Sequence, residues 1–216
     1  MLSTAENWLS LDMSSSTGSL ALHRAENGRL TLLAEVDLPD GGKHSEAFLP
    51  ALQTILGKAD LTPQQIHRWI TCSGPGSFTG LRIAYAGIKA FSLATGACIE
   101  ILHAHEARAL SYCAQTQTKP PHFWVQTQVA REKFLQTEFE WVDDTLQMRE
   151  EILVEKVTAL AELRLTDKPT QDGGTVFPLH ARFLAENLLQ AKSRKTLREW
   201  DAIAFAAPDY FGSRNY

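Results

Sequence analysis

Apolar and polar residues alternate along the first forty positions, a pattern typical of strands with one buried face. Residues 7–13, 19–25 and 29–38 each follow this alternation. Asn27 and Gly28 separate the last two segments, and this pair favours a tight hairpin because both residues tolerate positive φ. We therefore expect three consecutive strands at the start of the chain.

Helical periodicity begins at residue 43. Residues 43–59 place apolar side chains three and four positions apart, which predicts a helix. The short apolar run at 68–73 predicts a buried strand, and a glycine-rich turn and a long helix follow it. Residues 97–104 read as a further strand and 105–115 as a further helix.

The composition changes after Pro120-Pro121. Three segments there have strand character, namely 122–129, 133–142 and 145–153. We expect a short helix over 154–163, a loop over 172–178 and an amphipathic helix over 179–193. This order of elements predicts an α/β protein with two lobes, the first spanning residues 1–115 and the second, shorter one spanning 116–216.

The turn before the long helix reads SGPGSFTG over residues 73–80. Backbone N–H groups at such a helix start can hold a phosphate. A P-loop needs Lys and Ser or Thr after its last glycine, however, and this chain has Leu81 and Arg82. The third glycine also comes one place too late for a dinucleotide-binding loop.

Small residues recur through the helix itself, at Gly80, Ala84, Gly87 and Ala94. Small side chains at helical spacing permit close approach of a neighbouring backbone. Two partners fit this pattern, another element of the same chain or a second chain, and the spacing alone does not separate them.

Charge and cysteine content restrict the class of protein. The formal net charge of −4 gives no basic footprint for gripping nucleic acid unaided. The three cysteines have no CxxC spacing, which fits buried thiols in a reducing compartment. We see neither a secretion signal nor an apolar stretch long enough to cross a membrane, so we expect a cytoplasmic protein.

Residues 73–96 resemble the G-P-G-S-F-T-G-[VL]-R segment of the bacterial tRNA threonylcarbamoyladenosine biosynthesis family TsaB, also called YeaZ. The flanking order is similar: residues 9–22 resemble the opening strand–turn–strand of that family, and 43–56 its first helix. Residues 171–185 and 208–214 resemble its later loop–helix and closing segments. The resemblance implies the two-lobed α/β fold of actin-like ATPases, hsp70 and sugar kinases, with mixed sheets flanked by helices.

The resemblance also implies a function. The chain would be a noncatalytic accessory subunit that binds and activates a catalytic, TsaD-like paralogue in a heterodimer. Together they would support formation of N6-threonylcarbamoyladenosine (t6A) at position 37 of tRNAs that read codons starting with A. Further expected partners are a small TsaE-like ATPase, tRNA indirectly, and a second copy of this chain when it is alone.

Family members use their first two helices to pack against the equivalent pair of the partner. Carried over to this sequence, the partner interface comprises His44, Phe48, Leu52, Gly80, Ala84, Gly87, Phe91 and Ala94. Gly87→Leu is then expected to abolish complex formation and leave the chain folded.

Nucleotide binding is a separate expectation from the fold. Asp12, Ser14 and Ser15 offer a carboxylate and hydroxyls where actin-like ATPases hold Mg²⁺ and phosphates, but the same residue types also form turns. Only Asp172–Gly174 offers a second phosphate loop. We therefore expect no cofactor of its own, with ATP bound only in the assembled complex, and Asp12 acting as a turn acceptor.

Catalytic residues and metal ligands are not expected. The catalytic paralogue binds metal through H-x-x-x-H, and the two ligand positions fall here on Ala104 and Arg108. His103 and His105 lack a histidine four residues later, and no Ser-His-Asp or Cys-His set supports protease activity. Alternatives that stay open are a small-molecule kinase or ATPase of the same fold and a homodimeric scaffold without a tRNA role.

The second lobe departs from the family pattern. Thr127 and Val129 stand where an Asp and an Arg are usual, whereas Glu132 and the aromatic Phe134 are kept. Carry-over of contacts in this lobe is correspondingly weak.

Overall fold

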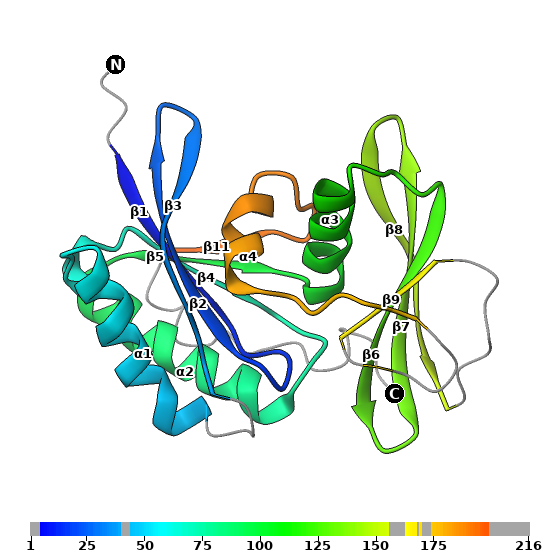
Figure 1. The fold of residues 1–216 in the computed structure, drawn as a ribbon, viewed down its shortest axis with the longest axis horizontal. Coiled ribbons are helices and arrows are strands. Elements are labelled where there is room, and N and C mark those ends of the chain that lie inside the picture. The colour runs from blue at the N-terminus through cyan, green and yellow to red at the C-terminus, as the bar shows by residue number, and fades with distance from the viewer. Residues whose placement is uncertain (1–4, 40–43, 156–162, 168, 170–173, 199–216) are drawn as a thin grey trace.

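The computed structural model describes residues 5–39, 44–155, 163–167, 169 and 174–198 of the chain. Its strands form two sheets (Figure 1). The strands of the first are β1 (Glu6–Asp12), β2 (Ser19–Glu26), β3 (Arg29–Asp37), β4 (Arg68–Cys72), β5 (Cys98–Leu102) and β11 (Lys195–Leu197). Their spatial order is β11-β5-β4-β1-β2-β3.

The first three strands form the predicted antiparallel meander. Asn27 and Gly28 have φ of 52° and 75°, which confirms the hairpin expected from their side chains. β4 then pairs parallel to β1, and β5 parallel to β4. Parallel neighbours need crossover connections, which the helices supply.

Helices cover both faces of this sheet, because alternate residues of its strands are apolar on each side. Leu9 and Leu11 of β1 face α1 (His44–Lys58) and α2 (Phe78–Thr95). Trp8 faces the opposite side, where it shares a core with α4 (Ala181–Asn187). The one-turn 3₁₀ helix η1 (Pro63–Gln65) precedes β4.

The second sheet also mixes parallel and antiparallel pairs. Its strands are β6 (His122–Ala130), β7 (Lys133–Val142), β8 (Thr145–Val154), β9 (Arg164–Thr166) and β10 (Thr175–Val176), in the order β10-β9-β6-β7-β8. Helix α3 (Ala104–Thr116) stands between the two sheets (Figure 1). Phe123, Val125 and Phe139 join Leu110 of α3 in one core, so this helix connects the lobes. The predicted class, two lobes with mixed sheets flanked by helices, is confirmed.

The chain returns to the first sheet at its C-terminal end, since β11 pairs with β5. The carboxylate of Glu100 holds this pairing: it accepts hydrogen bonds from Arg194 and Thr196 and forms an ion pair with Arg68. Residues 195–197 therefore complete the first sheet, although they come after the second. The division into domains at residues 115 and 116 stays a prediction.

The helix expected over 179–193 is shorter, and this part of the prediction is wrong. It ends at Asn187, whose side chain donates hydrogen bonds to the Ala107 carbonyl and Ser111 Oγ of α3. Beyond it, Glu106 accepts hydrogen bonds from the backbone N–H groups of Lys192 and Ser193. These tertiary bonds replace the helical ones that amphipathic periodicity predicts.

Three other expectations lie wholly or mainly outside the described residues. They are the helix over 154–163, of which Val154 belongs to β8, the second phosphate loop at Asp172–Gly174, and the closing segment 208–214. Over the described ranges, none of the helices has the length and apolarity to cross a membrane.

Candidate interface helices and interlobe cleft

The glycine-rich turn lies against the turn between β1 and β2. Ser77 N–H donates to the Ser14 carbonyl at 2.6 Å, and Ser77 Oγ caps α2 by accepting from Gly80 N–H at 3.2 Å. A Cβ added at Gly76 would stand 2.4 Å from the Ser14 carbonyl oxygen, and one added at Gly80 would stand 2.0 Å from that of Met13. Glycine is needed here because the helix start lies directly on the first hairpin.

Three of the four residues of the predicted small-residue stripe pack inside the chain. Gly80 and Ala84 are buried, and Gly87 lies against the ring of Phe48 from α1. A Cβ at Gly87 would approach Phe48 Cε1 to 2.4 Å, so a leucine there disturbs the helix pair itself. The expectation that Gly87→Leu leaves the chain folded is therefore corrected. Packing within the chain, one of the two alternatives left open, accounts for these small residues.

The other predicted interface residues divide between the interior and the surface. His44 is buried with Nε2 3.2 Å from the Ser16 carbonyl oxygen, and Leu52 is buried in the core. Phe91 is half-buried and stacks on Trp69, with ring centroids 5.2 Å apart. Ala94 is exposed. A partner role for these eight residues stays a prediction.

A different apolar surface stays open on the same two helices. Leu49 of α1 is 54% exposed, and Leu93 of α2 is 36% exposed. Ala86, Ala90 and Ala94 are also exposed and follow one another at intervals of four along α2. The sequence analysis missed Leu49, Ala86, Ala90 and Leu93, although the same helical spacing, started at residue 86, would have found the alanines.

A cavity of about 520 Å³ lies between the lobes. Its walls come from the β1–β2 turn, the starts of α1 and α2, the end of β6 and the residue after β9; the lining residues are Ser14, Ser15, Ser16, His44, Ser77, Thr79, Gly80, Ile83, Thr127, Gln128 and Asp167. Six of these side chains are hydroxyls, which suit hydrogen bonding to a polar ligand. Ser14 and Ser15, two predicted nucleotide residues, thus line a cavity.

Asp12, the third, lies buried behind this turn. Its Oδ1 accepts a hydrogen bond from Ser14 N–H at 3.0 Å, which confirms the expected turn-acceptor role. Burial raises the pKa of Asp12, against the hydrogen bond from Ser14. Burial and the Asp12 charge also raise the pKa of the Cys72 thiol well above its usual value, and that thiol lies 3.5 Å from Asp12 Oδ1. In the described part of the chain Asp12 Oδ2 has no hydrogen-bond partner.

Residues 104 and 108, at the positions of the paralogue's metal ligands, lie on the first turns of α3. Arg108 is buried and donates from Nη1 to Thr127 Oγ1 at 3.0 Å. His105 is buried between Thr127 and Thr137, with its ring nitrogens 3.0 and 2.7 Å from their hydroxyls. Burial lowers the pKa of His105 well below its usual value, and the charge of Arg108 adds to this. These contacts assign Thr127 a role that the sequence analysis did not foresee, holding α3 to the second sheet.

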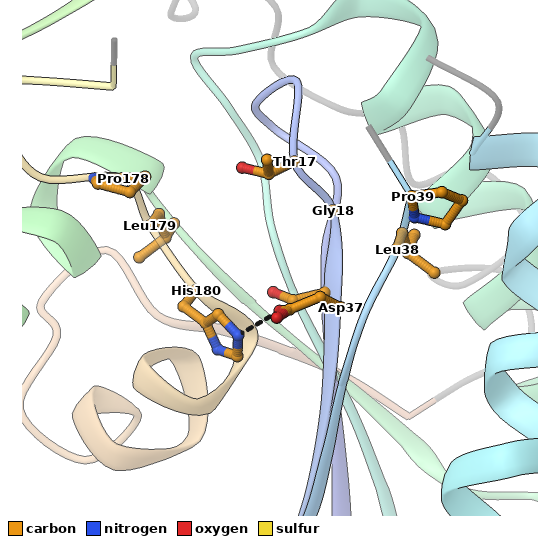
Figure 2. A pocket seen from close by; sticks show the side chains of 9 residues that line it. Thr17, Gly18, Asp37, Leu38, Pro39, Pro178, Leu179 and His180 are labelled. Carbon is orange, nitrogen blue, oxygen red and sulfur yellow. Dashed lines mark hydrogen bonds and ion pairs between the residues drawn. The ribbon is translucent and has the colours of Figure 1, made fainter. Parts of the chain in front are cut away.

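A second cavity, of about 630 Å³, lies between the β2–β3 pair and the segment that leads into α4 (Figure 2). Figure 2 shows His180 pointing toward Asp37 across it, with His180 Nε2 2.9 Å from Asp37 Oδ1. Nearby, Ser19 Oγ accepts a hydrogen bond from Ala181 N–H at 2.9 Å. Both contacts fasten the start of α4 to the β2–β3 pair.

Comparisons with known proteins bear on this arrangement. The family model described as TsaD, tRNA N6-adenosine threonylcarbamoyltransferase, matches residues 40–207. The tRNA threonylcarbamoyladenosine biosynthesis protein TsaB of Bacillus subtilis (strain 168) is 35% identical over 75 residues, which are 35% of this chain and 31% of TsaB. The matched region thus spans about a third of that curated relative.

Two solved structures from Pseudomonas aeruginosa share the fold. YeaZ superposes with a TM-score of 0.69, and a protein described as similar to peptidase YEAZ with a TM-score of 0.71. Each is 16% identical, and each alignment covers 95% of this chain and 99% of the other. With this family model matched over more than half of its length, the chain belongs to the family described as TsaD, tRNA N6-adenosine threonylcarbamoyltransferase, and it shares the fold of YeaZ.

Proposed function

We propose that this protein is a noncatalytic accessory subunit that binds and activates a TsaD-like catalytic paralogue in t6A biosynthesis. The match to the TsaD family model and the similarity to TsaB support a role in this tRNA modification. One structural observation carries the proposed mode of action: the outer face of the α1–α2 pair exposes Leu49, Leu93 and a row of alanines, whereas its inner face packs on the first sheet.

The proposed interface uses that outer face. Leu49 and Leu93 supply the larger apolar contacts, and the alanines at 86, 90 and 94 allow a partner helix to approach closely. The buried residues Phe48, Ala84 and Gly87 act indirectly, since they set the distance between the two helices. A homodimer of this chain would use the same face when the paralogue is absent.

The noncatalytic role is supported by the residues that stand at the paralogue's ligand positions. Ala104 has no ligand atom, and the guanidinium of Arg108 is a cation that repels a metal ion. Arg108 moreover donates a hydrogen bond to the hydroxyl of Thr127. Activation of the paralogue through contact is the mode of action that these residues favour.

The same proposal also covers nucleotide binding, the further binding partners and the cellular compartment. The hydroxyl-lined interlobe cavity would receive ATP only in the assembled complex, where the paralogue and a small TsaE-like ATPase complete the machinery, and tRNA is reached through the paralogue. The three free cysteines suit a reducing cytoplasm.

Reconstitution tests the proposal. The catalytic paralogue from the same cell is incubated with an unmodified tRNA transcript, threonine, bicarbonate, ATP and the other subunits, with and without this chain, and t6A is measured by mass spectrometry. The proposal predicts t6A only when this chain is present. Equal t6A without it would contradict the accessory role, and ATP turnover by this chain alone would favour the kinase alternative.

A further inference from the structure

Helix α4 leaves part of the first sheet uncovered. Its seven residues span roughly 10 Å at 1.5 Å per residue. The eight residues of β2 span roughly 26 Å at about 3.3 Å per residue. The β2–β3 hairpin therefore projects beyond the helix, on the face opposite α1 and α2 (Figure 1).

A groove of about 600 Å³ occupies this uncovered part. Its floor is apolar, formed by Trp8, Ala25 and Leu30 of the strands and Ala185 of α4. Leu189, at its edge, is 75% exposed. Leu32, 39% exposed, continues the apolar surface along the same face of β3, because Leu30 and Leu32 lie opposite Ala25 and His23 of β2. Exposed leucines at such a groove indicate an unfilled contact surface.

The rim of the groove is acidic. Glu6, Glu26 and Glu186 line it, against the single cation Arg29. Glu6 is already paired with Arg68 at 2.8 Å. Glu26 and Glu186 are exposed, and over the described residues neither forms an ion pair. Two carboxylates that form no ion pair within the described ranges thus flank an apolar floor, although the charge of Arg182 acts on Glu186 and Arg29 lies opposite Glu26.

We propose that this groove binds a segment of a partner protein in which lysine or arginine side chains flank leucine-like side chains. The apolar side chains fill the floor between Trp8 and Leu189, and the cations reach Glu26 and Glu186. Charge complementarity selects this chemistry. An acidic or uncharged polar segment forms no ion pairs with the rim carboxylates, and its polar groups would lose their hydration on the apolar floor. The groove and the α1–α2 face lie on opposite sides of the first sheet, so this proposal is independent of the proposed function and allows two partners at once.

A synthetic peptide tests the chemistry directly. The probe is a fluorescein-labelled amphipathic peptide of leucine and lysine, compared with one carrying glutamate for lysine and one carrying serine for leucine. Fluorescence anisotropy measures affinity, and ¹⁵N–¹H spectra of the labelled protein locate the contact. We expect only the leucine–lysine peptide to bind, with shifts confined to residues 6–8, 25–30 and 185–190. Binding should weaken as NaCl rises from about 50 to about 300 mM.

Variants make the test specific. Glu26→Lys combined with Glu186→Lys is expected to weaken binding by about fivefold or more, and Leu189→Ser by a similar factor. The control combines Glu150→Lys with Glu155→Lys, the same charge change at exposed sites around β8, and should bind as wild type. Equal binding of the acidic peptide, unchanged binding by the groove variants, or shifts outside the groove would each overturn the proposal.

Discussion

Gly87 of α2 and Phe48 of α1 touch so closely that any side chain at residue 87 must displace the phenylalanine ring. The contact joins the two helices of the proposed interface, and Phe48 also meets Phe91 edge to face at 6.3 Å. The spacing of the helix pair, and hence the shape of its outer face, depends on this glycine.

Gly87→Ala is expected to destabilise the protein by about 1–3 kcal/mol, the usual cost of overpacking. Urea unfolding followed by circular dichroism measures this. Gly57→Ala is the matched control, because a Cβ at Gly57 of α1 meets nothing within 4 Å and alanine is the better helix former. We expect it to be neutral or stabilising by up to about 1 kcal/mol. Equal stability of the two variants would show that the Gly87–Phe48 contact is not tight.

The buried His23 is expected to lower the free energy of unfolding in acid. Burial lowers the pKa of His23 in the folded protein to about 4, whereas unfolded histidine titrates near about 6.5. Between these values only the unfolded state takes up the proton, so this contribution is full above about pH 6.5 and is lost as the pH falls toward about 4. The loss amounts to about 3 kcal/mol.

His23→Leu removes the titrating group and places an apolar side chain at the same buried position. Unfolding free energies measured between pH 7 and pH 4 should then fall less steeply than in wild type. Burial also lowers the pKa of His105, so part of the acid sensitivity remains. An identical pH dependence in variant and wild type would rule out His23 as a source.

Thr127 is expected to be a structural link between the lobes. Thr127→Val leaves His105 Nε2 and Arg108 Nη1 without the hydroxyl that both contact, at a cost of about 1–3 kcal/mol. Thermal unfolding compares it with Thr31→Val, an exposed site on β3 where we expect a change within about 0.5 kcal/mol. A Thr127→Val protein as stable as the Thr31→Val protein would contradict this role.

Local pattern predicted the elements whose partners are near in sequence. The hairpin at Asn27-Gly28 and the start of α2 after the glycine-rich turn follow from turn chemistry and helical spacing. The return of the chain to the first sheet does not, because it depends on Arg194 meeting Glu100 across ninety-four positions. The early end of α4 likewise depends on Glu106 of a distant helix.

The small residues predicted for the interface lie on the same helix as the exposed alanines, but most of them face the core of the chain. Small residues permit close packing on either side of a helix, and periodicity cannot tell which side meets the chain's own core. Gly80, Ala84 and Gly87 face inward, whereas the exposed stripe begins at Ala86. Only the position of α1 over α2, fixed by Phe48, decides between the two faces.

The mass of the complex in solution tests the central claim most directly. This chain is mixed with the catalytic paralogue and passed through size-exclusion chromatography with light scattering. The double variant Leu49→Glu with Leu93→Glu is run alongside, together with the control Met148→Glu on β8, whose exposure lies between those of the two leucines. The account predicts a heterodimer for wild type and for Met148→Glu and separate proteins for the double variant. A heterodimer that forms equally well with Leu49→Glu and Leu93→Glu would contradict it.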